Sequence, residues 1–367
     1  MKARSASFLQ RQNRVSDMKA GHRIVASTCI ASLCGGALLL AGTAQAQTNT
    51  EFYRGKQINM LIGYSAGGGY DLYARMVSRY MGKHVPGNPG IVPQNMPGAG
   101  SLKVVNYLAQ VAPRDGTAIG TFGRSLPLYP LLIGPADFDA TKFGYLGSVA
   151  TDVSLCISWH QSPIQSWKDV VTKEYRAGGE GRGSEPDVFA TVLQKVFDTK
   201  TKLITGYPGT AEMTLAMQRG EIDGLCGISY STLQSIHSDW LQSGQVKILV
   251  QSAAKKHAAI PDVPLITDLM KDPRKSAILD LIVAPQEMAR PFATPPGLPP
   301  ERLQALRDAF DATMKDSEFL AEMKKSKLDV DPVSGKTIQN LVTKLWASPK
   351  DVIEAAAAAS GAEPGKK

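Results

Sequence analysis

Three consecutive glycines mark the first place where residue types and spacing could do chemistry. Within QINMLIGYSAGGGYDLYAR, residues 57–75, an apolar run is followed by this turn and then by a helical pattern. Glycines at a strand-to-helix turn let the backbone bend sharply and leave its N–H groups uncovered. Those groups and the positive end of the helix dipole suit an anion. The residues expected at this site are Tyr64, Ser65, Ala66, Gly67, Gly68, Gly69, Tyr70 and Asp71.

Similar strand-to-helix junctions recur along the chain. They occupy residues 95–101, 178–184, 206–210 and 226–231. In open α/β sheets, ligands bind beyond the carboxyl ends of the strands, where such junctions lie. Each junction alone is explained by a tight turn with a helix cap, but several in one chain favour a shared cleft.

Two charged residues of these turns have more than one interpretation. Asp71 follows the glycines and could cap its helix, fix a bound water or accept a hydrogen bond from a ligand. Arg182 lies inside a glycine turn and could pair with a carboxylate or be a solvated surface charge. The sequence leaves both choices open.

Residues 63–67, GYSAG, match the G-x-S-x-G nucleophile elbow, which makes a serine hydrolase with Ser65 as nucleophile the main alternative to a binding protein. An elbow follows earlier strands, and a loop after one of them completes the oxyanion hole, whereas this turn ends the first strand. The histidines outside the leader stand in no recognisable catalytic setting; they are His84, His160, His237 and His257. No spacing fits a metal, a dinucleotide or a P-loop. The sequence therefore predicts binding without catalysis, cofactor or metal.

The first 46 residues have the pattern of a secretory leader. A basic start precedes the apolar residues 24–40, and Ala44-Gln45-Ala46 is a typical cleavage site, so the mature chain is expected to begin at Gln47. Translation from Met18 instead of Met1 would give a leader of more ordinary length. An uncleaved membrane anchor is the alternative. We expect a soluble protein exported to the periplasm.

The chain outside the leader is almost balanced in charge. The leader holds six of the 41 basic residues and one of the 33 acidic ones, which leaves 35 and 32 and a net charge of +3. The basic pI therefore gives no reason to expect nucleic acid. Cys29 and Cys34 belong to the leader, whereas Cys156 and Cys226 remain. In an oxidising compartment they could form a disulfide or stay separate buried thiols.

Strand and helix patterns alternate after the leader. Predicted strands are residues 57–63, 90–95, 117–122, 145–149, 154–159, 175–178, 201–205, 222–226 and 246–251. Predicted helices include residues 102–109, 184–198, 209–219, 230–242, one that opens at 299–300, 337–346 and 352–359. The alternation is typical of α/β architecture with largely parallel sheets. Ser184, followed by Asp187, is the expected N-cap of its helix.

Several segments occur in a specific order: FYRGKQINMLIGYSAGGGYDLYAR, PQNMPGAGSLKVVNYL, PRDGTAIGTF and GYPGTAEMTLAMQRGEIDG. Together they resemble the substrate-binding proteins of tripartite tricarboxylate transporters, the Bug family, and the likeness covers essentially the whole mature chain. It implies a type II-like periplasmic-binding-protein fold, in which two α/β lobes with mixed sheets flanked by helices close on a ligand and extra helices follow at the C-terminus.

The resemblance also implies a division of the chain. Lobe one would comprise residues 51–144 plus 246–294, and lobe two residues 145–245. The C-terminal helices, residues 295–360, would pack across both lobes, and residues 361–367 would be a frayed tail after them. Residues 1–46 would be the signal peptide.

The resemblance implies that the first glycine turn and the P-G-A-G turn hold a ligand carboxylate through backbone groups and ordered water. The second of these turns is Pro97, Gly98, Ala99, Gly100 and Ser101. Lobe two would contribute Arg182, Gly183 and Ser184, and Gly209 and Thr210 from a further turn. Glu180, Arg182 and Glu185 make the first lobe-two turn more charged than is usual.

The implied function is capture of a small organic anion: a di- or tricarboxylate, an aromatic acid or an acidic amino acid. The protein, expected to be a monomer, would deliver this anion to inner-membrane permease subunits. A solute sensor without a dedicated permease is the other interpretation. The identity of the carboxylate stays open.

Overall fold

The structure, a computed structural model, describes residues 48–362. The expected leader, its cleavage site between Ala46 and Gln47, and residues 363–367 of the expected tail lie outside this range. Within it, no helix is both long and apolar enough to cross a membrane.

The first sheet has six strands in the order β11-β4-β10-β3-β1-β2. These strands are β1 (Gln57–Ile62), β2 (Gly90–Asn95), β3 (Ala118–Thr121), β4 (Gly144–Ser148), β10 (Pro291–Thr294) and β11 (Val333–Ser334). β1 pairs in parallel with β2 and β3, while β10 pairs antiparallel with β3 and β4. β1 forms because Ile58, Met60 and Ile62 are all fully buried between the flanking helices.

The second sheet has five strands in the order β7-β6-β8-β5-β9. These strands are β5 (Ser154–Trp159), β6 (Glu174–Gly178), β7 (Lys200–Ile204), β8 (Gly224–Ser229) and β9 (Val246–Ser252). β6 is parallel to β7 and β8, whereas β5 is antiparallel to β8 and β9. Two mixed sheets with flanking helices confirm the predicted fold class. The expectation of largely parallel sheets is wrong, because β10 and β11 in the first sheet and β5 in the second pair antiparallel with their neighbours. We call the parts around the first and second sheets lobe one and lobe two.

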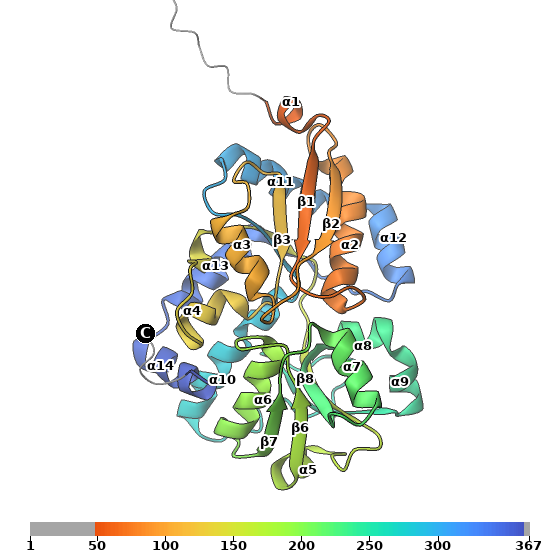
Figure 1. Cartoon of the computed structure of the whole chain (residues 1–367), viewed down its shortest axis with the longest axis vertical. Coiled ribbons are helices and arrows are strands. Elements are labelled where there is room, and N and C mark those ends of the chain that lie inside the picture. Colours follow the sequence, from red (N-terminus) through yellow and green to blue (C-terminus); the bar gives the residue numbers. More distant parts are fainter. Residues whose placement is uncertain (1–47, 363–367) are drawn as a thin grey trace, which may run out of the picture. The chain divides into compact units, whose positions relative to one another are not determined.

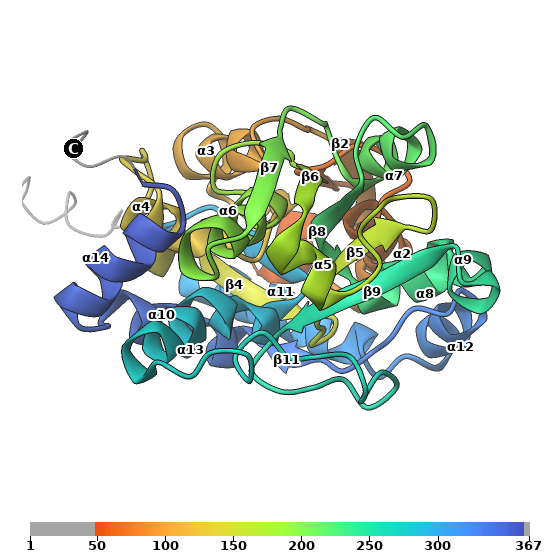
Figure 2. The same ribbon diagram turned by 90° about the horizontal axis from the view of Figure 1, so that it is seen from below.

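Helices cover both sheets (Figure 1). They are α1 (Asn49–Tyr53), α2 (Gly69–Met81), α3 (Leu102–Gln110), α4 (Tyr129–Leu132), α5 (Trp167–Thr172), α6 (Glu185–Val196), α7 (Thr210–Gln218), α8 (Tyr230–Ile236), α9 (Ser238–Ser243), α10 (Pro273–Val283), α11 (Pro300–Thr313), α12 (Ser317–Lys325), α13 (Gly335–Trp346) and α14 (Lys350–Ala359). Short 3-10 turns are η1 (Gly82–His84), η2 (Leu126–Leu128), η3 (Ala140–Lys142) and η4 (Ala284–Met288). Figure 2 shows the strands of the second sheet side by side and α14 against α10.

The predicted lobe boundaries are wrong at two strands. β4, whose Tyr145 was expected to open lobe two, pairs with β10 and β11 in the first sheet. β9, with Val246, was expected in lobe one but pairs with β5 in the second sheet. The chain therefore crosses between lobes at residues 149–153 and 284–290. A local residue pattern predicts that a strand is present. The sheet to which the strand belongs depends on pairing with distant strands, and for this reason β4 and β9 were assigned to the wrong lobes.

The C-terminal helices contact both lobes. α13 packs on β4 of the first sheet, and α14 packs on α10 and α6 beside the second. The helix expected at residues 230–242 is split into α8 and α9, because His237 leaves the helical conformation with φ −127° and ψ 37°.

Cys156 and Cys226 lie on β5 and β8, which are antiparallel neighbours in the second sheet. Their sulfurs are joined in a disulfide with an S–S distance of 2.05 Å. The two cysteines are 70 residues apart in the sequence. The bridge therefore closes a long loop within lobe two.

Loss of this bridge should destabilise the protein. The chain-entropy model gives a loss of about 4 kcal/mol in the free energy of unfolding, which urea unfolding of a Cys156→Ser, Cys226→Ser double variant would measure. Alkylation of the denatured, exported protein should label neither cysteine until a reductant is added. Two labelled thiols without reductant would contradict this prediction.

Candidate functional site

The first glycine turn joins β1 to α2, with Gly68 as the N-cap. Gly67 has φ +88°, a conformation that favours glycine. The first turn of α2 presents N–H groups that have no acceptor within the helix. A Cβ added at Gly68 would meet no protein atom within 4 Å. Open space for a small ligand therefore lies beside Gly68, whereas a Cβ added at Gly69 would lie 2.1 Å from Thr232 Oγ1.

Asp71 does not cap α2, which corrects one of the interpretations given to it. It lies in the first helical turn, almost fully buried, and accepts hydrogen bonds from the Gly67 N–H (2.9 Å), Arg75 Nε (2.9 Å) and Asn95 Nδ2 (2.8 Å). Burial alone would raise the pKa of Asp71, but these donors hold it below its ordinary value. The ionised carboxylate fixes the glycine turn against the end of β2.

The second predicted turn of lobe one is a run of left-handed residues. Ala99, Gly100 and Ser101 have φ of 48°, 58° and 70°. The Leu102 N–H bonds to the Ala99 carbonyl, so the first donor of α3 is used within the turn. The buried Ser101 Oγ accepts from the Gly123 N–H at 2.8 Å, which ties the turn to the chain after β3. The donors left for a ligand here are those of the turn itself.

The structure brings this turn against the first predicted turn of lobe two. A Cβ added at Gly100 would lie 2.4 Å from the Ser184 Cβ. A Cβ added at Gly181 would lie 3.1 Å from the Ala99 Cα. The backbones of the two lobes can approach this closely only because glycine stands at both positions.

The first glycine turn of lobe one also meets the turn that precedes α7 in lobe two. Ser65 Oγ donates a hydrogen bond to Glu212 Oε2 at 2.9 Å, across from lobe one to α7. A Cβ added at Gly209, the N-cap of α7, would lie 2.7 Å from Ser65 Oγ. Thr210 begins the helix beside it.

Ser184 caps α6, as predicted, and accepts a hydrogen bond from the Asp187 N–H. Asp187 Oδ1 in turn accepts from the Glu180 N–H (2.8 Å) and the Gly181 N–H (3.1 Å). These two N–H groups of the turn are therefore occupied by a side chain of lobe two itself. Arg182 is exposed and donates through Nη2 to the Ile133 carbonyl at 3.1 Å.

Two buried arginines between the lobes were missed by the sequence reasoning. Arg124 is fully buried after β3, and its Nε donates to Glu185 Oε2 at 2.7 Å. Arg290, just before β10, is 1% exposed and donates to Ser229 Oγ at 3.0 Å, as Arg124 does at 2.9 Å. Gly123 and Arg124 directly follow a predicted strand, so the rule applied to the other junctions would have found Arg124.

The Arg124–Glu185 ion pair joins lobe one to α6 of lobe two. Burial would lower the pKa of Arg124, but the Glu185 carboxylate together with Tyr70 and Asp152 holds that pKa above its ordinary value. Gln286 Nε2 also donates to Glu185 Oε1 at 2.6 Å. The pair is thus a buried charged contact between the segment after β3 and the start of α6.

Two stacked tyrosine rings lie beside the Arg124–Glu185 ion pair. The rings of Tyr64 and Tyr70 stack with centroids 4.6 Å apart. Tyr70 accepts a hydrogen bond from the Arg124 N–H at 3.1 Å, and the Arg290 guanidinium lies 4.9 Å from the Tyr70 ring. Burial raises the pKa of both phenols, so both are neutral.

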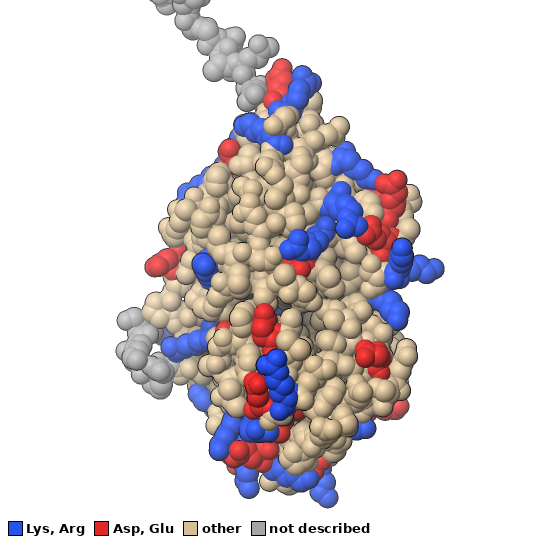
Figure 3. Space-filling model, turned by 45° about the vertical axis from the view of Figure 1, so that its right-hand side comes forward, with Lys and Arg blue, Asp and Glu red and all other residues tan. Residues whose placement is uncertain are grey.

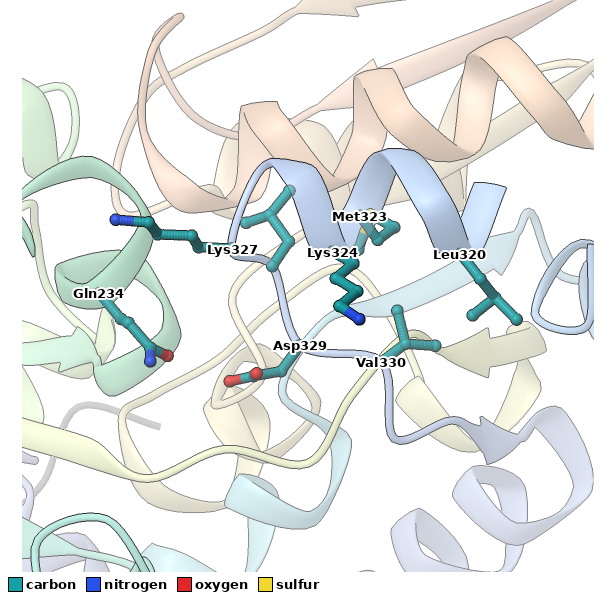
Figure 4. A pocket seen from close by; sticks show the side chains of 8 residues that line it. Gln234, Leu320, Met323, Lys324, Lys327, Asp329 and Val330 are labelled. Atoms are coloured by element: carbon teal, nitrogen blue, oxygen red, sulfur yellow. The ribbon is translucent and has the colours of Figure 1, made fainter. Parts of the chain in front are cut away.

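A pocket of about 350 Å³ is lined by none of the predicted site residues (Figure 4). It is lined by Gln234, Leu320, Met323, Lys324, Lys327, Leu328, Asp329 and Val330. Beside Ser125 and Gly183, at the interface between the lobes, a pocket of only about 10 Å³ is present. The lobes are therefore closed on each other around Gly183.

Charges of both signs are interspersed on the face drawn in Figure 3. Between α2 and α12, for example, Arg79 pairs with Glu322. This distribution agrees with the nearly balanced charge outside the leader. Within residues 48–362, no group of three or more His, Cys, Asp or Glu side chains is arranged to hold a metal ion.

Ser65 is not placed for nucleophilic catalysis. Its partner is the Glu212 carboxylate, and none of the histidines in the described part of the chain bonds to it. His84 pairs with Asp316, and His237 stacks on Trp240 with ring centroids 3.7 Å apart. A histidine in reach of the serine hydroxyl is what the nucleophile-elbow form of the hydrolase alternative requires.

We therefore expect a fluorophosphonate probe to leave Ser65 unlabelled. Labelling would be followed by mass spectrometry of the tryptic peptides, with Ser65→Ala as the control. Modification of Ser65 that disappears in the control would restore the hydrolase interpretation.

The glycine turns of the two lobes face each other, and this arrangement is typical of a two-lobed solute-binding protein. The model of the tripartite tricarboxylate transporter family receptor matches residues 73–357, and the chain belongs to that family. This is a family of receptors, not of enzymes. A curated relative, the UPF0065 protein in the gbd 5'region of Cupriavidus necator, is 23% identical over 84% of this chain and 88% of its own length.

Solved structures show the same fold. The periplasmic binding protein BugD superposes with a TM-score of 0.66 at 20% identity, over 83% of this chain and 98% of its own. MatC from Rhodopseudomonas palustris, solved with bound malate, gives a TM-score of 0.63 at 17% identity, over 81% and 99%.

Proposed function

We propose that this protein is a periplasmic solute-binding protein that captures a small organic carboxylate between its two lobes and delivers it to a permease in the inner membrane. The observation that carries the proposal is the turn at Gly68, where α2 begins without a side-chain cap and an added Cβ would enter space free of protein atoms. Family membership and the malate bound to MatC agree with it.

Closure of the two lobes is the change that the permease recognises. The Ser65–Glu212 hydrogen bond and the Arg124–Glu185 ion pair join the two lobes in this closed arrangement. A ligand that touches both lobes shifts the population toward the closed form by its differential affinity for that form. A permease that docks on the closed form would then distinguish loaded from empty protein.

The proposal is tested by native mass spectrometry of the protein isolated from its host periplasm. We expect the export-processed chain with an organic acid bound. Calorimetric titration with carboxylates and with neutral sugars then tests the class. Tight binding of a neutral sugar and no heat from any carboxylate would overturn the proposal.

A further inference from the structure

The two sides of the cleft present different polar groups. In lobe one, the first turn of α2 offers N–H donors, as described above. In lobe two, Asp187 occupies the N–H groups of Glu180 and Gly181. Lobe two was expected to offer N–H donors at this turn. Carboxylate groups lie next to the turn instead.

Glu180 is the member of this group that lacks a partner. Glu180 is only 6% exposed, and its Oε2 has no hydrogen-bond partner within residues 48–362. The neighbouring acids are all engaged: Asp187 with the turn, Glu185 with Arg124, and Glu212 with Ser65. A buried carboxyl oxygen without a partner is costly, so a ligand group that satisfies it is strongly favoured.

The charges around Glu180 indicate which ligand group this is. Burial, followed by the carboxylates of Asp187, Glu185 and Glu212, raises the pKa of Glu180 well above its usual range. From lobe one the group facing it is Tyr64, a neutral phenol. A ligand carboxylate placed here would add another negative charge, whereas a cation would be attracted by all of these acids.

We propose, on the basis of the proposed function, that Glu180 binds a positively charged nitrogen of the ligand. The ligand is then an organic acid with an ammonium or another cationic nitrogen at a distance from its carboxylate. Its carboxylate faces the donors of α2 in lobe one, and its nitrogen forms a charge-assisted hydrogen bond with Glu180 in lobe two. Simple di- and tricarboxylates bind more weakly than such a ligand.

Calorimetric titration with matched probe pairs tests this inference. 4-Aminobutanoate and glutarate, and likewise 5-aminopentanoate and adipate, differ only in the group at one end of the same methylene chain; L-aspartate and L-malate differ in one amino group. The amino member of at least one pair should bind about tenfold or more tightly than its partner. Glu180→Gln, which keeps the side-chain volume, should remove that advantage without weakening the diacid. Glu221→Gln, a matched change on the surface of lobe two, should alter neither.

Proton release gives a readout that a merely structural role would not change. Pairing with a cation lowers the pKa of Glu180, so binding of an amino probe should release a proton at those pH values where the free protein carries this carboxyl group protonated. Heats measured in buffers of different ionisation enthalpy report this proton. Glu180→Gln should abolish the release.

The outcomes separate this inference from the proposed function. If a diacid binds more tightly than its amino partner and Glu180→Gln changes neither, the inference is wrong and the proposed function stands. If no amino probe binds, the inference is also wrong. If no carboxylate of either kind binds while a neutral sugar does, both are wrong.

Discussion

Replacing Gly100 by valine should abolish ligand binding and leave both lobes folded. A Cβ at this position would come 2.4 Å from the Ser184 Cβ and 3.1 Å from the Ser184 Cα, so the P-G-A-G turn could no longer reach lobe two. The clash exists only in the closed form, because an open cleft separates the two turns. We expect a loss of affinity of about 100-fold or more, since the closed form is the one that holds the ligand.

Backbone strain must be separated from this effect. Gly100 has φ +58°, and a side chain there costs about 1–2 kcal/mol in the folded protein whatever lies opposite. Gly55 is a matched control, because it has φ +69° and a Cβ there would meet no atom within 4 Å. Gly55→Val should show a similar loss of thermal stability but normal binding by calorimetry. Normal binding by Gly100→Val would contradict the closed arrangement described above.

Arg124→Met should weaken binding on the order of 100- to 1,000-fold. Removing one partner of a buried ion pair leaves the other charge uncompensated, at a cost of about 3–5 kcal/mol. Here we expect the cost to fall on the closed form, because Arg124 and Glu185 come from different lobes and are buried against each other in this closed arrangement. Calorimetry gives the affinity, and small-angle scattering gives the fraction of closed protein with ligand present.

A second substitution and a control identify the cause. If the unpaired Glu185 is responsible, Arg124→Met combined with Glu185→Gln should regain at least part of the lost affinity. The ion pair between Arg176 and Asp223 lies within lobe two and is partly exposed, so Arg176→Met should leave binding unchanged. A double variant as weak as Arg124→Met alone would show that Arg124 acts directly on the ligand instead.

Local signals in the sequence predicted most of the elements and turns. β2 and β5 have the predicted bounds, and Ser184 caps α6, because short strand-forming runs between turn residues and N-cap chemistry are properties of a few consecutive residues. The glycine turns were predicted for the same reason, since left-handed or closely approached positions need glycine. Their pairing across the lobes was implied only by the family resemblance.

Features that depend on distant partners were not predicted. The sheets to which β4 and β9 belong are decided by pairing with strands far along the chain. Arg290 looks like an ordinary surface cation in the sequence, yet it is buried against Ser229 and the Tyr70 ring. The part that Asp71 plays in fixing the glycine turn was not among the interpretations considered, because its partners include Asn95, at the end of another strand.

The central claim is that a carboxylate is held at the turn before α2, and Gly68→Val tests it most directly. A side chain at Gly68 would enter space free of protein atoms and should leave the fold intact. Gly90→Val is the matched control, because a Cβ there also meets no atom but lies at the start of β2, away from the turn. We predict that calorimetric titration with the carboxylate bound by the wild type gives no heat for Gly68→Val and normal binding for Gly90→Val, with unchanged thermal melting in the first. Wild-type affinity in Gly68→Val would contradict the account.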